Sequence, residues 1–239
     1  MGSARVAERD LDLGMDTAAD AASLALLRGD EVIAERAWHV DSTMSKELLG
    51  QLDALLTDAG ATRSEIASIA VTTGPGTYGA VRTGLATAQG LALALDVPLA
   101  GVGRLEAEAA LYLATAEIGR TVIAVHEAGR SGIAWAAYVL DAPGGISRCT
   151  VEPRLSTPDE VAREAPVATW CGEVADTLRD ALRDAGRGSG DTEGTAPSGS
   201  RAAALVRIAR GRQAYGDPAL VDAFYLRPPS ITRAKPREV

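Results

Sequence analysis

The sequence predicts an α/β fold made of two halves. Strand-like and helix-like runs alternate along the chain, and each half opens with a strand followed by a hairpin-like pair. The chain has 239 residues, 46% of them hydrophobic, which is enough to bury a large core without a disulfide or a metal. Strands that alternate with helices predict mainly α/β sheets, with a mixed edge where the hairpin lies.

The first half begins with a strand and a hairpin and continues with helices and strands. Apolar alternation over 11–15 predicts the first strand, and a glycine turn at 28–30 joins the two apolar runs of the hairpin. Leucines at helical spacing over 45–59 predict a helix that Gly60 ends. The other expected elements are a capping-box turn from Thr62 to Glu65, strands at 66–72 and 98–102, and helices at 79–95 and 104–116.

The second half repeats the alternation of strands and helices after Thr121. The expected elements are strands at 122–125, 133–140 and 167–171 and helices at 174–185 and 201–213. A Gly-, Ser-, Thr- and Pro-rich stretch at 186–200 is expected to be a mobile loop, and the chain from Pro228 on to be extended or disordered. We expect an N-terminal lobe at 1–104, joined by part of 201–239, and a smaller C-terminal lobe at 105–200.

The charge balance argues against direct binding of a nucleic-acid backbone. Against 32 acidic residues stand 24 basic ones, a formal net charge of −8. Phosphate binding depends on clustered Lys and Arg, and the aromatic content of 4% leaves few platforms for stacked bases. If RNA is involved, another subunit is expected to hold it.

The chain is expected to be a cytoplasmic protein with reduced thiols. No run reaches the roughly 18–20 apolar residues of a membrane-spanning helix, and the first ten residues do not resemble a secretory signal. Cys149 and Cys171 lack metal-ligand spacing and are too few for a disulfide scaffold.

The string from Gly74 to Gly79 has the spacing G-x-G-x-x-G between a strand and a helix. A dinucleotide site is disfavoured because the motif is not in the first βαβ unit, Pro75 removes a backbone donor, and Asp96 precedes the next strand instead of ending it. The sequence contains no P-loop, no clustered histidines and no serine-hydrolase motif. No catalytic constellation and no metal site are therefore predicted.

The helix at 79–95 carries a stripe of small residues, one every four positions. The stripe consists of Ala80, Gly84, Ala88 and Ala92. Such a stripe lets another backbone approach closely. Spacing alone leaves two interpretations open: the stripe packs on the protein's own sheet, or it receives a partner helix.

Asp16 ends the first strand and is followed by Thr17 and the hairpin. In folds of the actin, sugar-kinase and Hsp70 type, an acid at this place faces the metal and phosphates of a nucleotide. The second half offers only Glu127 at the matching place, and no glycine-rich adenosine-binding string follows it. Half of a nucleotide clamp is present, so independent ATP hydrolysis is not expected.

Four segments together resemble the bacterial TsaB family, also called YeaZ, over nearly the whole chain. They are Asp16-Thr-Ala with its hairpin, Ser45-Lys-Glu-Leu-Leu49, the run from Thr73 to Leu91, and Tyr225-Leu-Arg-Pro-Pro229. The resemblance implies a two-lobed actin-like fold of the ASKHA or ribonuclease H-like kind, with mixed sheets flanked by helices. It also implies a non-catalytic subunit of the machinery that makes N6-threonylcarbamoyladenosine in tRNA.

In that family the subunit pairs with the metal-bearing transferase TsaD, an ATPase called TsaE completes the assembly, and the subunit alone forms homodimers. The resemblance implies that tRNA is met only through the complex, that no membrane is involved, and that no cofactor is needed beyond a possible ATP or ADP at the partner interface. The partner surface would be formed by the two helices of the first lobe. The implied partner-binding residues are Ser45, Leu48, Leu52, Leu55, Tyr78, Ala80, Arg82, Gly84, Ala88 and Gln89. The implied nucleotide-binding residues are Asp16, Thr17, Gly74 and Gly76.

The sequence departs from the family pattern at two places. Met44 stands where the family has His, and 125–128 reads Val-His-Glu-Ala where the family has Asp-Ala-Arg. Two other functions remain open from the sequence. One is an enzyme acting on its own, either a metal-dependent glycopeptidase or a small actin-fold ATPase, and the other is a module that senses nucleotide through the Gly74 loop.

Overall fold

Two β-sheets organise the chain. The structure, a computed structural model, describes residues 9–19, 21–39, 44–114, 117–129, 132–141, 147–187 and 200–227. The first sheet has the order β3-β2-β1-β4-β5. Its strands are β1 (Leu11–Asp16), β2 (Ala21–Arg28), β3 (Glu31–His39), β4 (Ile66–Gly74) and β5 (Leu99–Gly103). Strands β1, β2 and β3 pair antiparallel, whereas β4 pairs parallel with both β1 and β5.

Helices cover both faces of the first sheet. Alternation along β4 sends Ile69 and Val71 to one face, where they pack with α1 (Met44–Asp58) and α2 (Tyr78–Leu95). Ala70 points to the other face and packs with α6 (Arg201–Gly211) and α3 (Arg104–Leu113). The two faces of this parallel strand are therefore both buried, which explains its nearly continuous apolar sequence.

The second sheet has the order β8-β7-β6-β9 and is built in the same way. Its strands are β6 (Thr121–Glu127), β7 (Ile133–Leu140), β8 (Ser147–Ser156) and β9 (Thr169–Gly172). Val122 of β6 packs against α3, and the next residue, Ile123, packs against α4 (Pro158–Glu164) and α5 (Asp176–Asp184). Helix α3 thus contributes to one hydrophobic core on the first sheet and to another on the second sheet.

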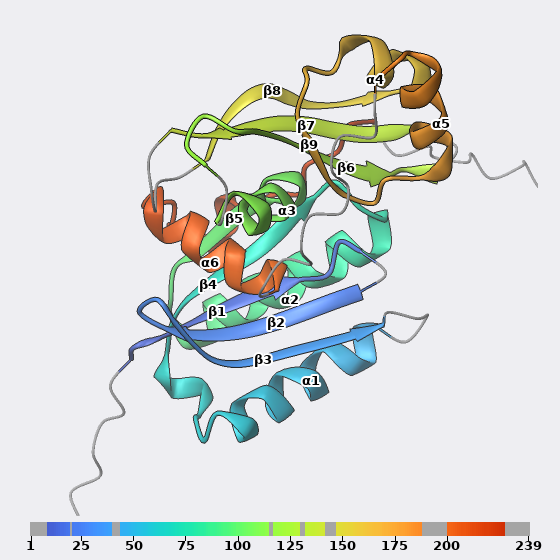
Figure 1. Ribbon diagram of the computed structural model, residues 1–239. Coiled ribbons are helices and arrows are strands. Elements are labelled where there is room, and N and C mark those ends of the chain that lie inside the picture. Colours follow the sequence, from blue (N-terminus) through green and yellow to red (C-terminus); the bar gives the residue numbers. More distant parts are fainter. Residues whose placement is uncertain are drawn as a thin grey trace, which may run out of the picture.

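The elements stack as alternating helical and sheet layers (Figure 1). Helices α1 and α2 form the outer layer on the first sheet, α3 and α6 lie between the two sheets, and α4 and α5 cover the second sheet. Because α3 contacts strands of both sheets, the lobe boundary expected at 104 stays a prediction. Helix α6 comes from the C-terminal part of the chain but packs on β1, β2 and β4 of the first sheet.

Most of the elements expected from the sequence are present, with ends shifted by a few residues. The first hairpin, the capping box at Thr62 and the four long helices that pack on the first sheet all occur where the sequence predicted them. Strand β8 and helix α4 were not expected. Strand β8 alternates exposed polar residues with half-buried ones at the edge of the sheet, so its apolar signal is weak.

Helix α4 nevertheless carries a start signal in the sequence. The Thr157 hydroxyl accepts from the Glu160 amide, the Glu160 carboxylate accepts from the Thr157 amide, and Pro158 takes the first helical position. Most of the loop expected at 186–200 and the tail expected from Pro228 on lie outside the described residues. Within the described ranges, no helix is both long enough and apolar enough to cross a membrane.

Candidate functional site

The small-residue stripe of α2 faces the protein's own first sheet. Ala88 is fully buried, and a Cβ built on Gly84 would lie 2.0 Å from the Thr17 Oγ1 atom. Glycine at 84 is therefore required by the close approach of α2 to the residue that follows β1. The interpretation of this stripe as a surface for a partner helix is wrong, because the stripe is already covered.

The leucines expected on the partner surface are also interior. Leu48, Leu52 and Leu55 of α1 are buried in the core that α1 and α2 form with the first sheet. Their regular spacing marks the inward face of an amphipathic helix, which is the commoner meaning of such a pattern. The expected partner-binding residues that the structure buries are Leu48, Leu52, Leu55, Ala80, Gly84 and Ala88. The Ser45 side chain lies outside the described part of the structure.

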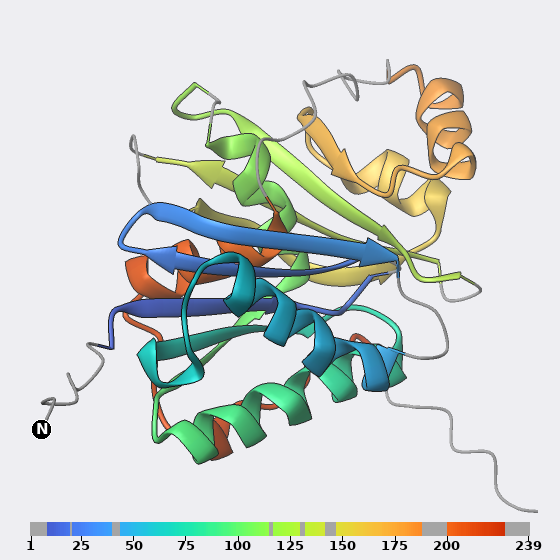
Figure 2. The ribbon, with the colours of Figure 1, turned by 90° about the horizontal axis from the view of Figure 1, so that it is seen from below.

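A second line of small residues runs along the outward side of α2. It consists of Gly79, Thr83, Ala86 and Gly90, and the corresponding outward positions of α1 are Gly50 and Ala54. These residues, flanked by the exposed side chains of Leu49 and Leu93, are called the outer face below. Figure 2 shows α1 and α2 on the same side of the first sheet, below it in this view, which is the side on which this face lies. The spacing of four, three and four residues could have been found in the sequence. In the sequence we considered only the stripe of small residues that turned out to face inward.

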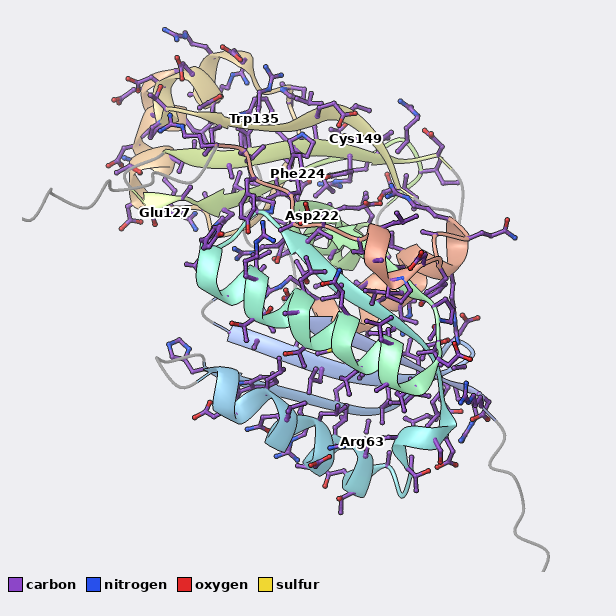
Figure 3. The ribbon with its side chains drawn as sticks, turned by 180° about the vertical axis from the view of Figure 1, so that it is seen from behind. Arg63, Glu127, Trp135, Cys149, Asp222 and Phe224 are labelled. Atoms are coloured by element: carbon purple, nitrogen blue, oxygen red, sulfur yellow. The ribbon has the colours of Figure 1, made fainter. Side chains whose placement is uncertain are left out.

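A C-terminal segment, residues 216–227, lies along α2 and is called the strap below. Gly216 and Leu99 exchange two backbone hydrogen bonds, and the Phe224 amide donates to the Thr73 carbonyl. The Gln89 amide group donates to the carbonyls of Pro218 and Val221. Gln89 therefore fixes the strap and is not part of an open surface. Figure 3 shows Asp222 and Phe224 on this segment, beside α2.

Asp16, expected to face a nucleotide, is fully buried and fully engaged. Its Oδ1 atom accepts hydrogen bonds from the Thr72 hydroxyl at 2.6 Å and from the Ala18 amide at 3.2 Å. Its Oδ2 atom accepts from Arg201 at the start of α6, and the same guanidinium donates to Glu108 of α3 at 3.0 Å. Both oxygens of the Asp16 carboxylate therefore already have partners within the chain.

The other expected nucleotide-binding residues lie close to Asp16 and also contact other parts of the chain. The Thr17 hydroxyl donates to the Ala80 carbonyl at 3.0 Å. A Cβ on Gly76 would lie 2.2 Å from the Ala18 carbonyl oxygen, and Gly74, at φ +115°, packs under the Phe224 carbonyl. The structure brings all four residues together, and they join the ends of β1 and β4 to α2 and the strap.

A charged cluster connects the first sheet's loops with the second sheet. Arg104, almost fully buried, donates to the Ala18 carbonyl and forms an ion pair with Glu173, which follows β9. The His126 Nδ1 atom lies 2.7 Å from both the Arg104 Nη1 atom and the Glu173 Oε2 atom. Because one nitrogen either donates or accepts, Nδ1 donates to Glu173 when it carries the hydrogen and otherwise accepts from Arg104. His126, which lies on β6, thus contacts both Arg104 at the start of α3 and Glu173 after β9.

Glu127, the acid expected to match Asp16 in the second half, is exposed at the end of β6. Its backbone amide donates to the Glu173 carboxylate at 3.3 Å, and its side chain takes no part in the cluster described above. The two acids therefore differ in their surroundings, since Asp16 is fully buried and Glu127 is exposed.

The cluster makes stability depend on pH in the acid range. Burial alone would raise the pKa of Glu173, but the hydrogen bond with His126 and the charge of Arg104 lower it from 4.5 to about 2. A depressed carboxylate pKa adds stability that is complete above 4.5 and is lost as pH falls toward 2. We expect wild type to melt at a higher temperature than Glu173→Gln at pH 7, with the difference disappearing between about pH 4.5 and 2. Thermal melts of both proteins across this range test this, and a constant difference contradicts it.

Metal-ligating side chains and thiols were candidates for further chemistry in the described ranges. No group of three or more His, Cys, Asp or Glu side chains is placed there to hold a metal ion. Both cysteines are free thiols. Burial raises the pKa of Cys149 to about 11 and raises that of Cys171 well above its ordinary value.

Comparisons with known proteins agree with this architecture. A family model described as "TsaD: tRNA N6-adenosine threonylcarbamoyltransferase" matches residues 39–146. The tRNA threonylcarbamoyladenosine biosynthesis protein TsaB of Bacillus subtilis is 37% identical over 98 residues, covering 41% of this chain and 43% of that protein. TsaB of Escherichia coli is 33% identical over 136 residues, covering 55% of this chain and 56% of that protein. The chain therefore spans about half the length of these curated relatives.

Solved structures extend the likeness to almost the whole fold. YeaZ from Pseudomonas aeruginosa superimposes with a TM-score of 0.71 and 24% identity, over 91% of this chain and all of that one. The two mixed sheets with α3 and α6 between them define a two-lobed α/β protein of the actin-like fold. Within that class, the chain is similar to the TsaB (YeaZ) proteins.

Proposed function

We propose that this chain is a non-catalytic subunit that docks with a TsaD-like transferase and supports it in making N6-threonylcarbamoyladenosine in tRNA. The names of its relatives support the pathway: three TsaB proteins are described as threonylcarbamoyladenosine biosynthesis proteins. In this proposal the chain works in the cytoplasm, forms homodimers when alone, assembles with a TsaE-like ATPase and meets tRNA only through the complex.

The single observation that carries the docking proposal is the outer face of α1 and α2. Small side chains at Gly79, Ala86 and Gly90 leave room for a second helix to approach closely. Most of the large hydrophobic side chains exposed in the described part of the chain also lie on α1, α2 and the strap. They are Leu49, Tyr78, Leu93, Leu220 and Phe224. Apolar groups that gather on one side of a protein mark an interaction site.

The proposed occupant is a transferase of the same fold. The family model of TsaD matches 39–146 of this chain, a segment that contains both α1 and α2. A TsaD-like protein is therefore expected to carry its own version of this helix pair, and two related surfaces can then pack in a nearly symmetric way. An interface of standard size buries about 800 Å² on each protein.

We propose a non-catalytic subunit because the side chains of Asp16 and Arg104 already have hydrogen-bond partners within the chain. An acid that served a nucleotide's metal ion would need open oxygens, and the oxygens of Asp16 bind Thr72, Ala18 and Arg201. Arg104 bridges the lobes next to the Ala18 carbonyl. The chain's own groups thus already occupy the oxygens of Asp16 and the donors of Arg104 that these hydrogen bonds use.

We expect Ala86→Arg and Gly90→Leu to abolish association with the cognate TsaD-like protein. Both positions are open in the isolated chain, and a bulky group at either one forces a docked helix away. Size-exclusion chromatography of the mixed proteins measures association, and threonylcarbamoyl transfer to tRNA with each variant measures function. Ala185→Arg, an exposed alanine after α5 in the second lobe, is the matched control and is expected to associate normally.

Two results would overturn the proposal. If both outer-face variants associate as well as wild type, the outer face is not the docking surface. If threonylcarbamoyl transfer to tRNA is equally fast without this chain, the chain does not support the transferase.

A further inference from the structure

Three side chains from distant parts of the chain form an exposed cluster at the start of α2. The rings of Tyr78 and Tyr225 stack with centroids 5.3 Å apart and planes 23° apart. The Arg82 guanidinium carbon lies 5.6 Å from the first ring centre and 5.4 Å from the second, within the range of a cation–π contact. The Tyr78 ring is 52% exposed, so this arrangement stands on the surface and not in a core.

Arg82 is held in one orientation by this cluster. Its Nε atom donates to the Tyr225 hydroxyl at 2.7 Å, which fixes the plane of the guanidinium. Its Nη1 atom lies 3.5 Å from an Asp222 carboxylate oxygen, and both of these side chains remain largely exposed. The end of the guanidinium therefore presents its two Nη nitrogens to solvent with only a long, exposed ion pair on one of them.

The position of the cluster depends on the fold of the whole first lobe. Tyr225 lies on the strap, 143 residues away from Arg82 in the sequence. Gln89 binds the strap at Pro218 and Val221, and Thr73 binds it at Phe224. The strap thus brings Tyr225 and Asp222 to the same end of α2 as Tyr78, beside the outer face.

We infer that Arg82, oriented by Tyr78 and Tyr225, binds a side-chain carboxylate of the docking partner at the edge of the outer face. This inference rests on the proposed function and names the chemistry of one contact in that interface. A guanidinium fixed by its Nε atom offers its two Nη nitrogens as a fork that fits a carboxylate. Asp222 already brings a carboxylate to this edge, and because its ion pair is long and exposed, a partner carboxylate can replace it. Tyrosine and arginine are also the residue types that dominate binding energy in protein interfaces.

The test measures binding of the purified cognate TsaD-like protein by titration calorimetry. We expect Arg82→Gln to weaken the dissociation constant by about thirtyfold, the effect of removing a strong interface contact. Arg82→Lys keeps the charge but loses the fork and the bond to Tyr225, and it is expected to weaken binding by about tenfold. Tyr225→Phe removes only the hydroxyl that orients Arg82, with an expected loss of about threefold. The matched control is Arg148→Gln, an exposed arginine in the second lobe that also pairs with one carboxylate, and it should bind normally.

Charge exchange identifies the carboxylate. Arg82→Glu should lose binding, and an Asp→Arg or Glu→Arg substitution on the facing helices of the partner should restore it at one position. The wild-type dissociation constant should also rise with added NaCl more steeply than that of Arg82→Gln. Thermal melts establish that each variant is folded, and if Arg82→Gln is not, Tyr225→Phe and the salt dependence of wild type decide the question.

The outcomes separate this inference from the proposed function. Normal binding by Arg82→Gln and Tyr225→Phe, together with lost binding by Ala86→Arg, overturns the carboxylate site and leaves the docking surface standing. Normal binding by all three variants overturns both.

Discussion

Gly84→Ala is expected to destabilise the protein by about 2 kcal/mol, although alanine is the better helix former. The added methyl group would lie 2.0 Å from the Thr17 Oγ1 atom and 3.1 Å from the Thr17 Cβ and Cγ2 atoms. Thr17 is fixed by its hydrogen bond to the Ala80 carbonyl, so either that bond breaks or α2 moves away from β1. For a chain of this length the loss corresponds to a fall of about 4–8 °C in the melting temperature, which circular dichroism measures.

Gly90→Ala is the matched control, six residues along the same helix on its exposed side. No atom lies within 4 Å of a Cβ built there, so the substitution should only improve helix propensity. We expect a gain of about 0.5–1 kcal/mol. The same chemical change thus has opposite signs on the two sides of α2. If Gly84→Ala proved as stable as wild type, the inward placement of the stripe would be wrong.

Arg201→Met is expected to destabilise the protein by about 3–5 kcal/mol, the usual effect of removing one partner from a buried ion pair. Asp16 is fully buried and Glu108 nearly so, and both lose their cation in this variant. Burial alone would lower the pKa of Arg201, but the two carboxylates raise it, so the arginine is charged in the folded protein at any working pH. A fall of roughly 10 °C in the melting temperature is expected.

Two further variants test whether the buried charge is the cause. Asp16→Asn combined with Arg201→Met removes one stranded carboxylate and should recover part of the loss. Arg28→Met breaks an exposed ion pair with Asp10 and should leave the melting temperature nearly unchanged. If Arg28→Met and Arg201→Met lower the melting temperature equally, the buried charge of Asp16 is not the cause of the destabilisation. A loss of nucleotide binding by Asp16→Asn, with no change in melting temperature, would do the same.

The sequence predicted the elements of the fold better than the direction in which they face. Helix α2 was expected within one residue of its observed start, because small and apolar residues recur with helical period. The helix carries small residues on two sides, however, and period alone does not say which side meets the sheet. Gly84 is covered by Thr17 and Gly90 is not, and this difference is created only when β1 is in place.

The candidate site was limited by the same lack of long-range information. Asp16 was correctly singled out as a special residue at the end of β1, but its partner, Arg201, lies 185 residues away. The Arg104, His126 and Glu173 cluster likewise joins three elements that are separated along the chain. No local motif predicts such contacts. The sequence alone therefore does not distinguish an acid that stabilises the fold from an acid that binds a nucleotide.

The return of α6 and the strap to the first sheet has a consequence for synthesis on the ribosome. The sheet they complete is formed by residues 11–103, yet Arg201 neutralises Asp16, and the strap closes over Gly74. A nascent chain that has emerged only as far as the second sheet carries an uncompensated carboxylate and an uncovered side of β1 and β4. We therefore expect the first sheet to reach its native packing only after the ribosome has released the segment that follows residue 200.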